Sequence, residues 1–344
     1  MFRRASLLSF TAALSILALF CAPACVEREE TITIMPDGTI HVEVEFEGGV
    51  DDVTTGDALL EDPGPWTVND TIKTDEDGDR TLTRKAALTV PPGADLPTHF
   101  AGDDDDLADL ALNFTTAVRT EDRPGGTYYH FKRVYHRRDW SHVEYYRRTF
   151  LQDELKKLDG KDLADLSEQD RGTVAEALIT FEAIKTLKIA EAAANALNET
   201  LPQEDWLAIH QGIRDVFEDV DRQDVVELLQ LEGEEAAAEI DAAVRDVNQK
   251  LESTIESVLD QRDPTGLMRQ TFMDQFERER RRYAITEDLQ DENIKVVARM
   301  PGRIIGHNSI SGDAEDGAVQ WEFDGKALND RDVILLATSV VEQN

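Results

Sequence analysis

Apolar and polar residues alternate along the first part of the chain, which is the pattern of a half-buried β-strand. Apolar residues occupy every second position of segment 40–46, and segment 31–35 precedes it across the turn Pro36-Asp37-Gly38. Two further strand pairs are predicted, at residues 66–73 with 81–90 and at 110–120 with 127–136. Short strands separated by Gly and Pro loops predict an antiparallel sheet.

The apolar period changes to three or four residues between about 140 and 288, which predicts amphipathic helices. The stripes are Leu178, Phe181, Ile184 and Leu187, then Trp206, Ile209, Ile213, Val216 and Val220, and then Ile240, Val244, Val247, Leu251, Ile255 and Val258. Ser167 with Asp170 predicts a capping box, and Asp263-Pro264 predicts an N-cap and first turn ahead of a helix at 267–283. We expect four to six helices, packed as a bundle or as paired hairpins.

The strand pattern returns at residues 294–300, 303–305, 318–323 and 333–341. A sheet of this size is marginal alone, so we expect these strands to pair with the N-terminal ones. The predicted fold class is therefore α+β: an antiparallel β domain formed by the N- and C-terminal segments, with an inserted α-helical bundle. The corresponding ranges are 25–139 and 291–344 for the two halves of the β domain and 140–290 for the insertion.

Residues 1–24 have the layout of a secretory signal, with Arg3 and Arg4 ahead of an apolar run at 7–20 and a small-residue site at Ala22-Pro23-Ala24. Cleavage after Ala24 leaves Cys25 first, and no cysteine follows it. The arrangement resembles bacterial lipoproteins, which implies a diacylglycerol on the Cys25 sulfur. Two or more acyl chains hold a protein stably on a bilayer. We therefore expect an exported, lipid-anchored envelope protein that faces the periplasm or the exterior. Ordinary signal peptidase cleavage, which releases a soluble protein with a free thiol, is the alternative.

Acidic residues outnumber basic ones, with 71 Asp and Glu against 36 Lys and Arg and a formal net charge of −35. Removal of Arg3 and Arg4 with the signal brings this charge to −37. So negative a surface repels polyanions, which excludes nucleic acid as a partner.

Segment 128–150 is basic and aromatic, unlike the rest of the chain. Its candidate ligand-binding residues are Arg133, Arg137, Arg138, Trp140, Arg147 and Arg148. Guanidinium groups among aromatic rings suit lipid phosphates, acidic glycans or an acidic protein partner. The alternative is a junction between sheet and bundle, in which these arginines pair with the chain's own carboxylates.

The sequence contains none of the motifs of metalloproteases, serine hydrolases, P-loop proteins or dinucleotide-binding proteins. His130, His136 and His142 recur every six residues, which fits neither a helix face nor a strand, so we interpret them as surface or junction histidines. The acidic turns at 75–79 and 103–106 lack the spacing of a calcium loop. We therefore predict no catalytic residue, metal site or cofactor.

The C-terminal segment resembles the end of LppM-type envelope lipoproteins. The residues that carry the resemblance are Val296-Val297-Ala298-Arg299-Met300-Pro301-Gly302-Arg303-Ile304-Ile305, Asn308, Val319-Gln320-Trp321-Glu322-Phe323 and Leu336-Ala337-Thr338-Ser339. The resemblance implies an envelope location and a lipid or glycolipid ligand, but no reaction. The long helical segment departs from that family's pattern. We expect a non-enzymatic binding or scaffolding module for lipid, glycan or protein, and the alternative is a carboxylate-dependent hydrolase of envelope polymers.

Overall fold

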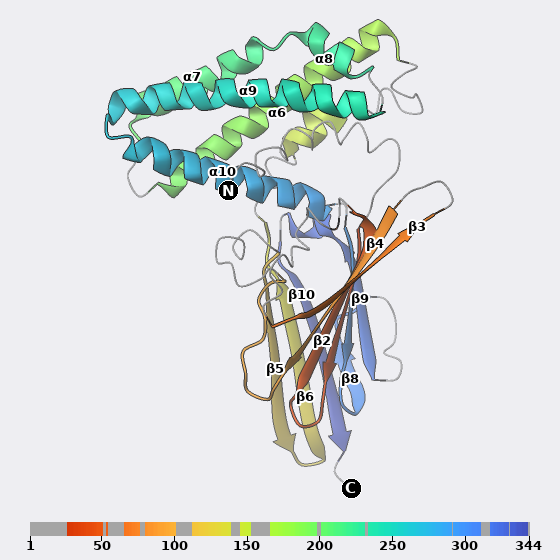
Figure 1. The fold of residues 1–344 in the computed structure, drawn as a ribbon. Coiled ribbons are helices and arrows are strands. Elements are labelled where there is room, and N and C mark those ends of the chain that lie inside the picture. Colours follow the sequence, from red (N-terminus) through yellow and green to blue (C-terminus); the bar gives the residue numbers. More distant parts are fainter. Residues whose placement is uncertain are drawn as a thin grey trace. The chain divides into compact units, whose positions relative to one another are not determined.

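The computed structural model describes residues 26–50, 53, 65–75, 80–100, 112–138, 145–152, 166–197, 201–230, 233–290, 292–310, 317–329 and 331–342. The chain divides into a helical unit that includes residues 140–284 and a β unit formed by residues 23–139 and 285–344 (Figure 1). Each unit has its own buried apolar core.

The β unit is a sandwich of two sheets whose inner faces share one core. The six-stranded sheet has the order β3 (Thr67–Thr74), β4 (Arg80–Val90), β2 (Ile40–Gly49), β1 (Glu27–Ile34), β7 (Asn293–Arg299) and β9 (Ala318–Asp324). The four-stranded sheet has the order β5 (Phe114–Arg123), β6 (Gly126–Tyr135), β10 (Val333–Glu342) and β8 (Arg303–His307). Strands from both ends of the chain thus share each sheet, which confirms the predicted α+β fold class.

One strand pair corrects the prediction of a wholly antiparallel sheet. β1 and β7 run parallel, with Glu27 opposite Asn293 and Thr33 opposite Arg299. The prediction rested on hairpins, and a hairpin fixes the direction only of strands that are neighbours in sequence. Strands separated by a long connection can pair in parallel, because the intervening chain supplies the crossover. The helical unit lies within that connection.

A polar cluster lies inside the sandwich, among the buried apolar residues of its core. The Glu30 carboxylate on β1 accepts from the Arg28 Nε at 2.9 Å and, across the sandwich, from an Arg133 terminal nitrogen at 2.6 Å and the Tyr135 hydroxyl at 2.7 Å. All four residues are at most 1% exposed. Burial raises the pKa of Tyr135 well above its ordinary value, so the hydroxyl remains a donor to Glu30. The cluster therefore joins the two sheets by charge-assisted hydrogen bonds.

Aromatic rings surround these two arginines. The Arg28 guanidinium carbon lies 4.7 Å from the Phe100 ring centroid, and that of Arg133 lies 3.8 Å from the Phe114 centroid. A cation over an aromatic face is attracted by the ring's electron density, most strongly where water is excluded. The rings therefore stabilise the buried guanidinium groups in addition to Glu30.

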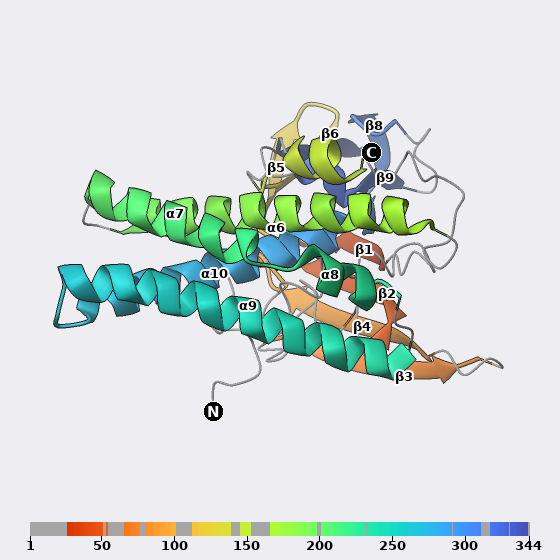
Figure 2. The same cartoon turned by 90° about the horizontal axis from the view of Figure 1, so that it is seen from above.

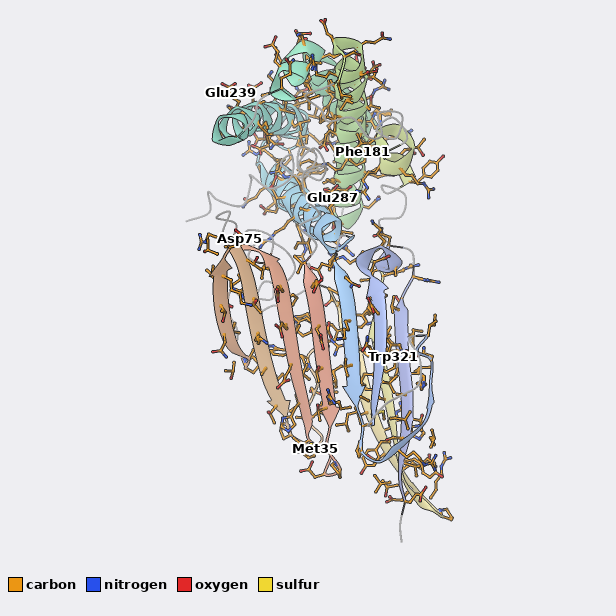
Figure 3. All side chains as sticks on the ribbon, turned by 90° about the vertical axis from the view of Figure 1, so that its right-hand side faces the viewer. Met35, Asp75, Phe181, Glu239, Glu287 and Trp321 are labelled. Carbon is orange, nitrogen blue, oxygen red and sulfur yellow. The ribbon has the colours of Figure 1, made fainter. Side chains whose placement is uncertain are left out.

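Asn308 makes a second connection between the sheets. Its side-chain oxygen accepts from the Trp321 indole nitrogen at 3.0 Å and from the backbone N–H of Leu336 at 2.8 Å. Trp321 belongs to β9 and Leu336 to β10, so one amide joins both layers; Figure 3 labels Trp321. These three residues belong to the C-terminal segment singled out in the sequence, and their contacts here are structural.

The described part of the helical unit contains α6 (Glu168–Ala196), α7 (Gln203–Glu218), α8 (Arg222–Leu228), α9 (Gly233–Arg262) and α10 (Leu267–Gln290), together with the short turn η2 (Arg147–Gln152) (Figure 2). The last residues of α10, from Ile285, belong to the β unit, and Ile285 and Leu289 are buried in its core. Among the helices that the structure describes, none has both the length and the apolar composition to cross a bilayer.

The ends of two helices test the predicted caps. The Ser167 hydroxyl accepts from the backbone N–H of Asp170 at 3.1 Å, which confirms the N-cap of α6. Asp263 is not the residue directly before a helix, as α10 begins at Leu267. Its carboxylate instead accepts from the N–H groups of Thr265 and Met268, so it caps the helix through an intervening turn.

Replacement of Glu30 by Gln should destabilise the β unit by on the order of 3 kcal/mol, because it removes the carboxylate that neutralises the buried Arg133 and leaves Arg28 with the more distant Glu292. The control Glu45→Gln removes an exposed ion pair with Lys85 and should cost at most about 1 kcal/mol. Urea unfolding followed by the NMR signal of the Trp321 indole N–H measures both. Equal unfolding midpoints for the two variants would contradict a structural role for the buried charge.

Candidate functional site

The structure places the predicted basic residues in different environments. Arg133 faces the interior of the sandwich and is occupied by Glu30. Arg138 is also buried; its backbone N–H donates to the carbonyl of Leu328 at 2.9 Å and its Nε donates to the Thr286 hydroxyl at 3.1 Å. Both guanidinium groups are held inside the β unit, away from an external anion.

Arg137 differs from its two neighbours in this set. Its side chain is exposed, while its backbone N–H donates to the Asp332 carboxylate at 2.9 Å. In the helical unit, Arg147 is buried on η2 and Arg148 is exposed. Trp140 and Cys25 lie outside the described residues. Within each unit, then, the arginines are not gathered into one exposed cluster.

The two described histidines of the basic segment contact threonine hydroxyls of neighbouring strands. A ring nitrogen of His130 lies 3.2 Å from the Thr338 hydroxyl, and one of His136 lies 2.7 Å from the Thr115 hydroxyl. His142, most of the 75–79 turn and the 103–106 run are outside the described residues. In the part of the chain that the structure describes, no three His, Cys, Asp or Glu side chains are grouped as metal ligands would be.

The helical unit contains a cavity of about 240 Å³ that the sequence did not indicate. It lies among α6, the C-terminal end of α7, α8 and α9. Its apolar lining includes Leu178, Ile179, Phe217, Val220, Val225 and Val247. Figure 3 labels Phe181 on α6, which marks the part of the helix where the cavity residue Leu178 lies one turn earlier in sequence. Apolar side chains from four helical segments thus form the interior of this cavity.

The rim of the cavity is acidic. Four exposed aspartates line it, namely Asp219, Asp221, Asp224 and Asp246. Lys250 is the one basic residue of the described lining, and its ammonium lies 2.7 Å from the Asp246 carboxylate. The hydrogen bond that the Lys250 ammonium donates to Asp246 raises the pKa of Lys250, and Asp219 adds to the effect through its charge. Lys250 therefore stays charged and neutralises only part of the rim.

A buried ion pair lies at the inner wall. Glu182 lines the cavity, and its carboxylate accepts from the Lys185 ammonium at 2.6 Å, with both side chains at most 5% exposed. The Lys185 ammonium also lies 5.5 Å from the ring centroid of Tyr283. Glu182 further borders a separate void of about 20 Å³, large enough for one water molecule. The inner wall is therefore polar at one point and apolar elsewhere.

The sequence signal for this site was weak. Leu178, Val220 and Val247 were assigned to helix stripes that face a core, and residues lining a cavity have the same period as residues filling one. The usable signal is the group of three aspartates within six positions, from Asp219 to Asp224, between the apolar pairs Val216-Phe217 and Val225-Val226.

Comparisons with known proteins assign no family. Neither a family model nor a curated protein matches the chain. Among solved structures, it is similar to the NMR structure of the folded domain of Mycobacterium tuberculosis LppM, with 10% sequence identity, a TM-score of 0.29 and coverage of 92% of this chain and 91% of that one. That TM-score is too low to show a common fold, so the similarity establishes neither ancestry nor function.

Arg138→Ala should lower the Tm by several degrees, because it removes a buried hydrogen bond from a charged group, with a cost of about 1.5 to 3 kcal/mol. Arg137→Ala is the matched control and should leave the Tm nearly unchanged, since its side chain is exposed. We expect neither variant to alter cosedimentation with phosphatidylglycerol vesicles. Unchanged Tm and lost vesicle binding in the Arg138 variant would make the basic segment the functional site instead.

Proposed function

We propose that this protein is a non-enzymatic binding module of the cell envelope, and that the cavity of the helical unit is its ligand site. The observation that carries the proposal is an apolar cavity of about 240 Å³. Protein interiors are close-packed, and voids much larger than a water molecule are few. A bound apolar group would supply the dispersion contacts that the lining side chains lack.

The volume limits the ligand. An apolar cavity of about 150 Å³ holds benzene, whereas sites for drug-sized molecules begin at about 300 Å³. A cavity of about 240 Å³ therefore suits one substituted ring or a short chain. A whole glycolipid or glycan is too large for it, so the proposed ligand is smaller than the one the sequence resemblance implied.

The β unit has a supporting role in this proposal. Its buried Arg28 and Arg133 are matched by Glu30 and by Glu292, which lies 3.6 Å from Arg28. Charges neutralised inside a core are not available to a ligand. The exposed acidic residues beside an apolar cavity are found in the helical unit, which is why we place the ligand there.

The envelope location is supported by the sequence. The secretory layout of residues 1–24 and the position of Cys25 as the sole cysteine after it suit a lipid anchor. The anchor would keep the binding module at a membrane surface after export.

Replacement of Cys25 by Ser should move the protein from the membrane fraction to the soluble fraction, because it removes the sulfur that would carry the lipid. Fractionation of cells that express each form gives the result. Mass spectrometry of the wild-type N-terminus provides the direct check, and an unmodified Cys25 would show that the anchor proposal is wrong.

Benzyl alcohol, a neutral probe with one ring, should bind saturably and shift the NMR signals of the cavity methyl groups. Ala243 lines the cavity on α9, and Ala243→Phe should abolish these shifts by filling the space. The control Ala242→Phe adds the same side chain at the exposed neighbouring position and should leave binding intact. If Ala243→Phe unfolds the protein, the smaller Ala243→Leu provides the same test.

Two outcomes would contradict the proposal. The absence of any benzyl alcohol binding to the wild-type protein would remove the ligand site. Hydrolysis of an envelope polymer by the purified protein would show that it is an enzyme, in agreement with the alternative hypothesis.

A further inference from the structure

We propose that the ligand of this cavity is a small organic cation, in which an ammonium or amidinium group is attached to a single ring or a short apolar chain. This inference rests on the proposed function, because it requires the cavity to be a ligand site. The apolar lining does not determine the charge of the ligand, whereas the acidic rim favours a positive one.

The charges around the cavity are predominantly negative. Its described lining contains five carboxylates, those of Glu182, Asp219, Asp221, Asp224 and Asp246, against the single ammonium of Lys250. The buried Lys185 neutralises Glu182, and Lys250 neutralises Asp246. The described lining supplies no further cation for Asp219, Asp221 and Asp224. Lys250 acts on Asp219 only through its longer-range charge, and Asp221 accepts from the backbone N–H of Gln223 at 2.8 Å; all three aspartates are on the exposed rim.

The arginines nearest to these aspartates in sequence pair with other carboxylates. Arg222 extends to Glu176 at 3.4 Å, and its guanidinium also covers Gly172. Arg214 pairs instead with Glu218 at 3.6 Å. Among the residues that the structure describes, no Lys or Arg forms an ion pair with Asp219 or Asp224. The local arginines are thus directed away from the rim.

Other classes of charged ligand fit this cavity less well. An anion that entered it would be repelled by the three rim carboxylates, because like charges repel. A bare divalent metal ion requires six to eight oxygen ligands in the case of calcium and gains nothing from apolar walls. An amine with an apolar body satisfies both parts of the site, since its charge lies at the acidic rim and its body occupies the apolar interior.

Three probes of nearly equal size separate the effect of charge from that of shape. Benzylamine is protonated at pH 7, benzyl alcohol is neutral and benzoate is negative. Titrations of the full-length protein, followed by the cavity methyl signals, should give benzylamine an affinity about tenfold above that of benzyl alcohol, with benzoate the weakest. The advantage of benzylamine should shrink as the salt concentration rises, because exposed charges are screened.

Matched variants locate the effect. The double variant Asp219→Asn with Asp224→Asn should reduce benzylamine affinity about tenfold and leave benzyl alcohol affinity unchanged. The control Asp215→Asn with Glu218→Gln removes the same charge from exposed positions of α7 that do not line the cavity. It should preserve most of the preference for benzylamine.

The outcomes distinguish this inference from the proposed function. Equal binding of benzylamine and benzyl alcohol, both abolished by Ala243→Phe, would overturn the cation inference and retain the ligand site. Equal losses in the rim and control variants would also overturn it, because the preference would then arise from net charge alone. Failure of all three probes to bind would overturn both.

Discussion

The parallel pairing of β1 with β7 is the constraint on which the β unit depends. It places two strands separated by more than 250 residues side by side in the interior of one sheet, with Glu27 opposite Asn293. β2 and β9 then pair on either side, and β10 joins β6 in the second sheet. Because these contacts join distant parts of the chain, the sandwich is complete only when the strands that follow the helical segment have paired with those that precede it. Contacts of such long sequence separation carry a large loop-closure cost, which the shared core of both sheets must offset.

The Glu30 cluster provides specificity for this arrangement. Successive strand residues face opposite sides, so a slip of β1 by one position would turn Glu30 outwards and leave Arg133 buried without its partner. Replacing buried ion pairs by apolar residues is often neutral or stabilising, which makes such a cluster weak evidence for stability in itself. Its effect here is better understood as fixing the register of β1 within its own sheet, since Glu30 must face Arg133 and Tyr135 of the opposite sheet.

The sequence predicted the elements and the pairing of the chain's two ends, but not the direction of that pairing or the partners of the buried charges. Strand alternation located the ten strands of the described residues, most of which have one apolar face, and the predicted pairing of the chain's two ends is confirmed. Alternation cannot reveal how the charges of the inward-facing Arg28 and Glu30 are accommodated, since Glu30 also needs partners from the other sheet. The basic segment met the same limit: its composition allowed either a ligand site or pairing with the chain's own carboxylates, and alternation does not show that Arg133 pairs with Glu30. The sequence did not predict the cavity, because Leu178 and Val247 have the same helical period whether they fill a core or line a void.

The two units use charge in opposite ways, which bears on the acidity of the whole chain. In the sandwich, Arg133 and Glu30 are desolvated and matched, so they produce little field outside. At the helical cavity, Asp219 and Asp224 face water, where a charge is available to a ligand and also contributes to the overall potential. A chain with a net charge of −35 raises the local concentration of cations around itself, and an acidic opening with low-dielectric walls focuses that field. The surplus of carboxylates, which serves solubility over most of the surface, would at this opening also speed the capture of a cation.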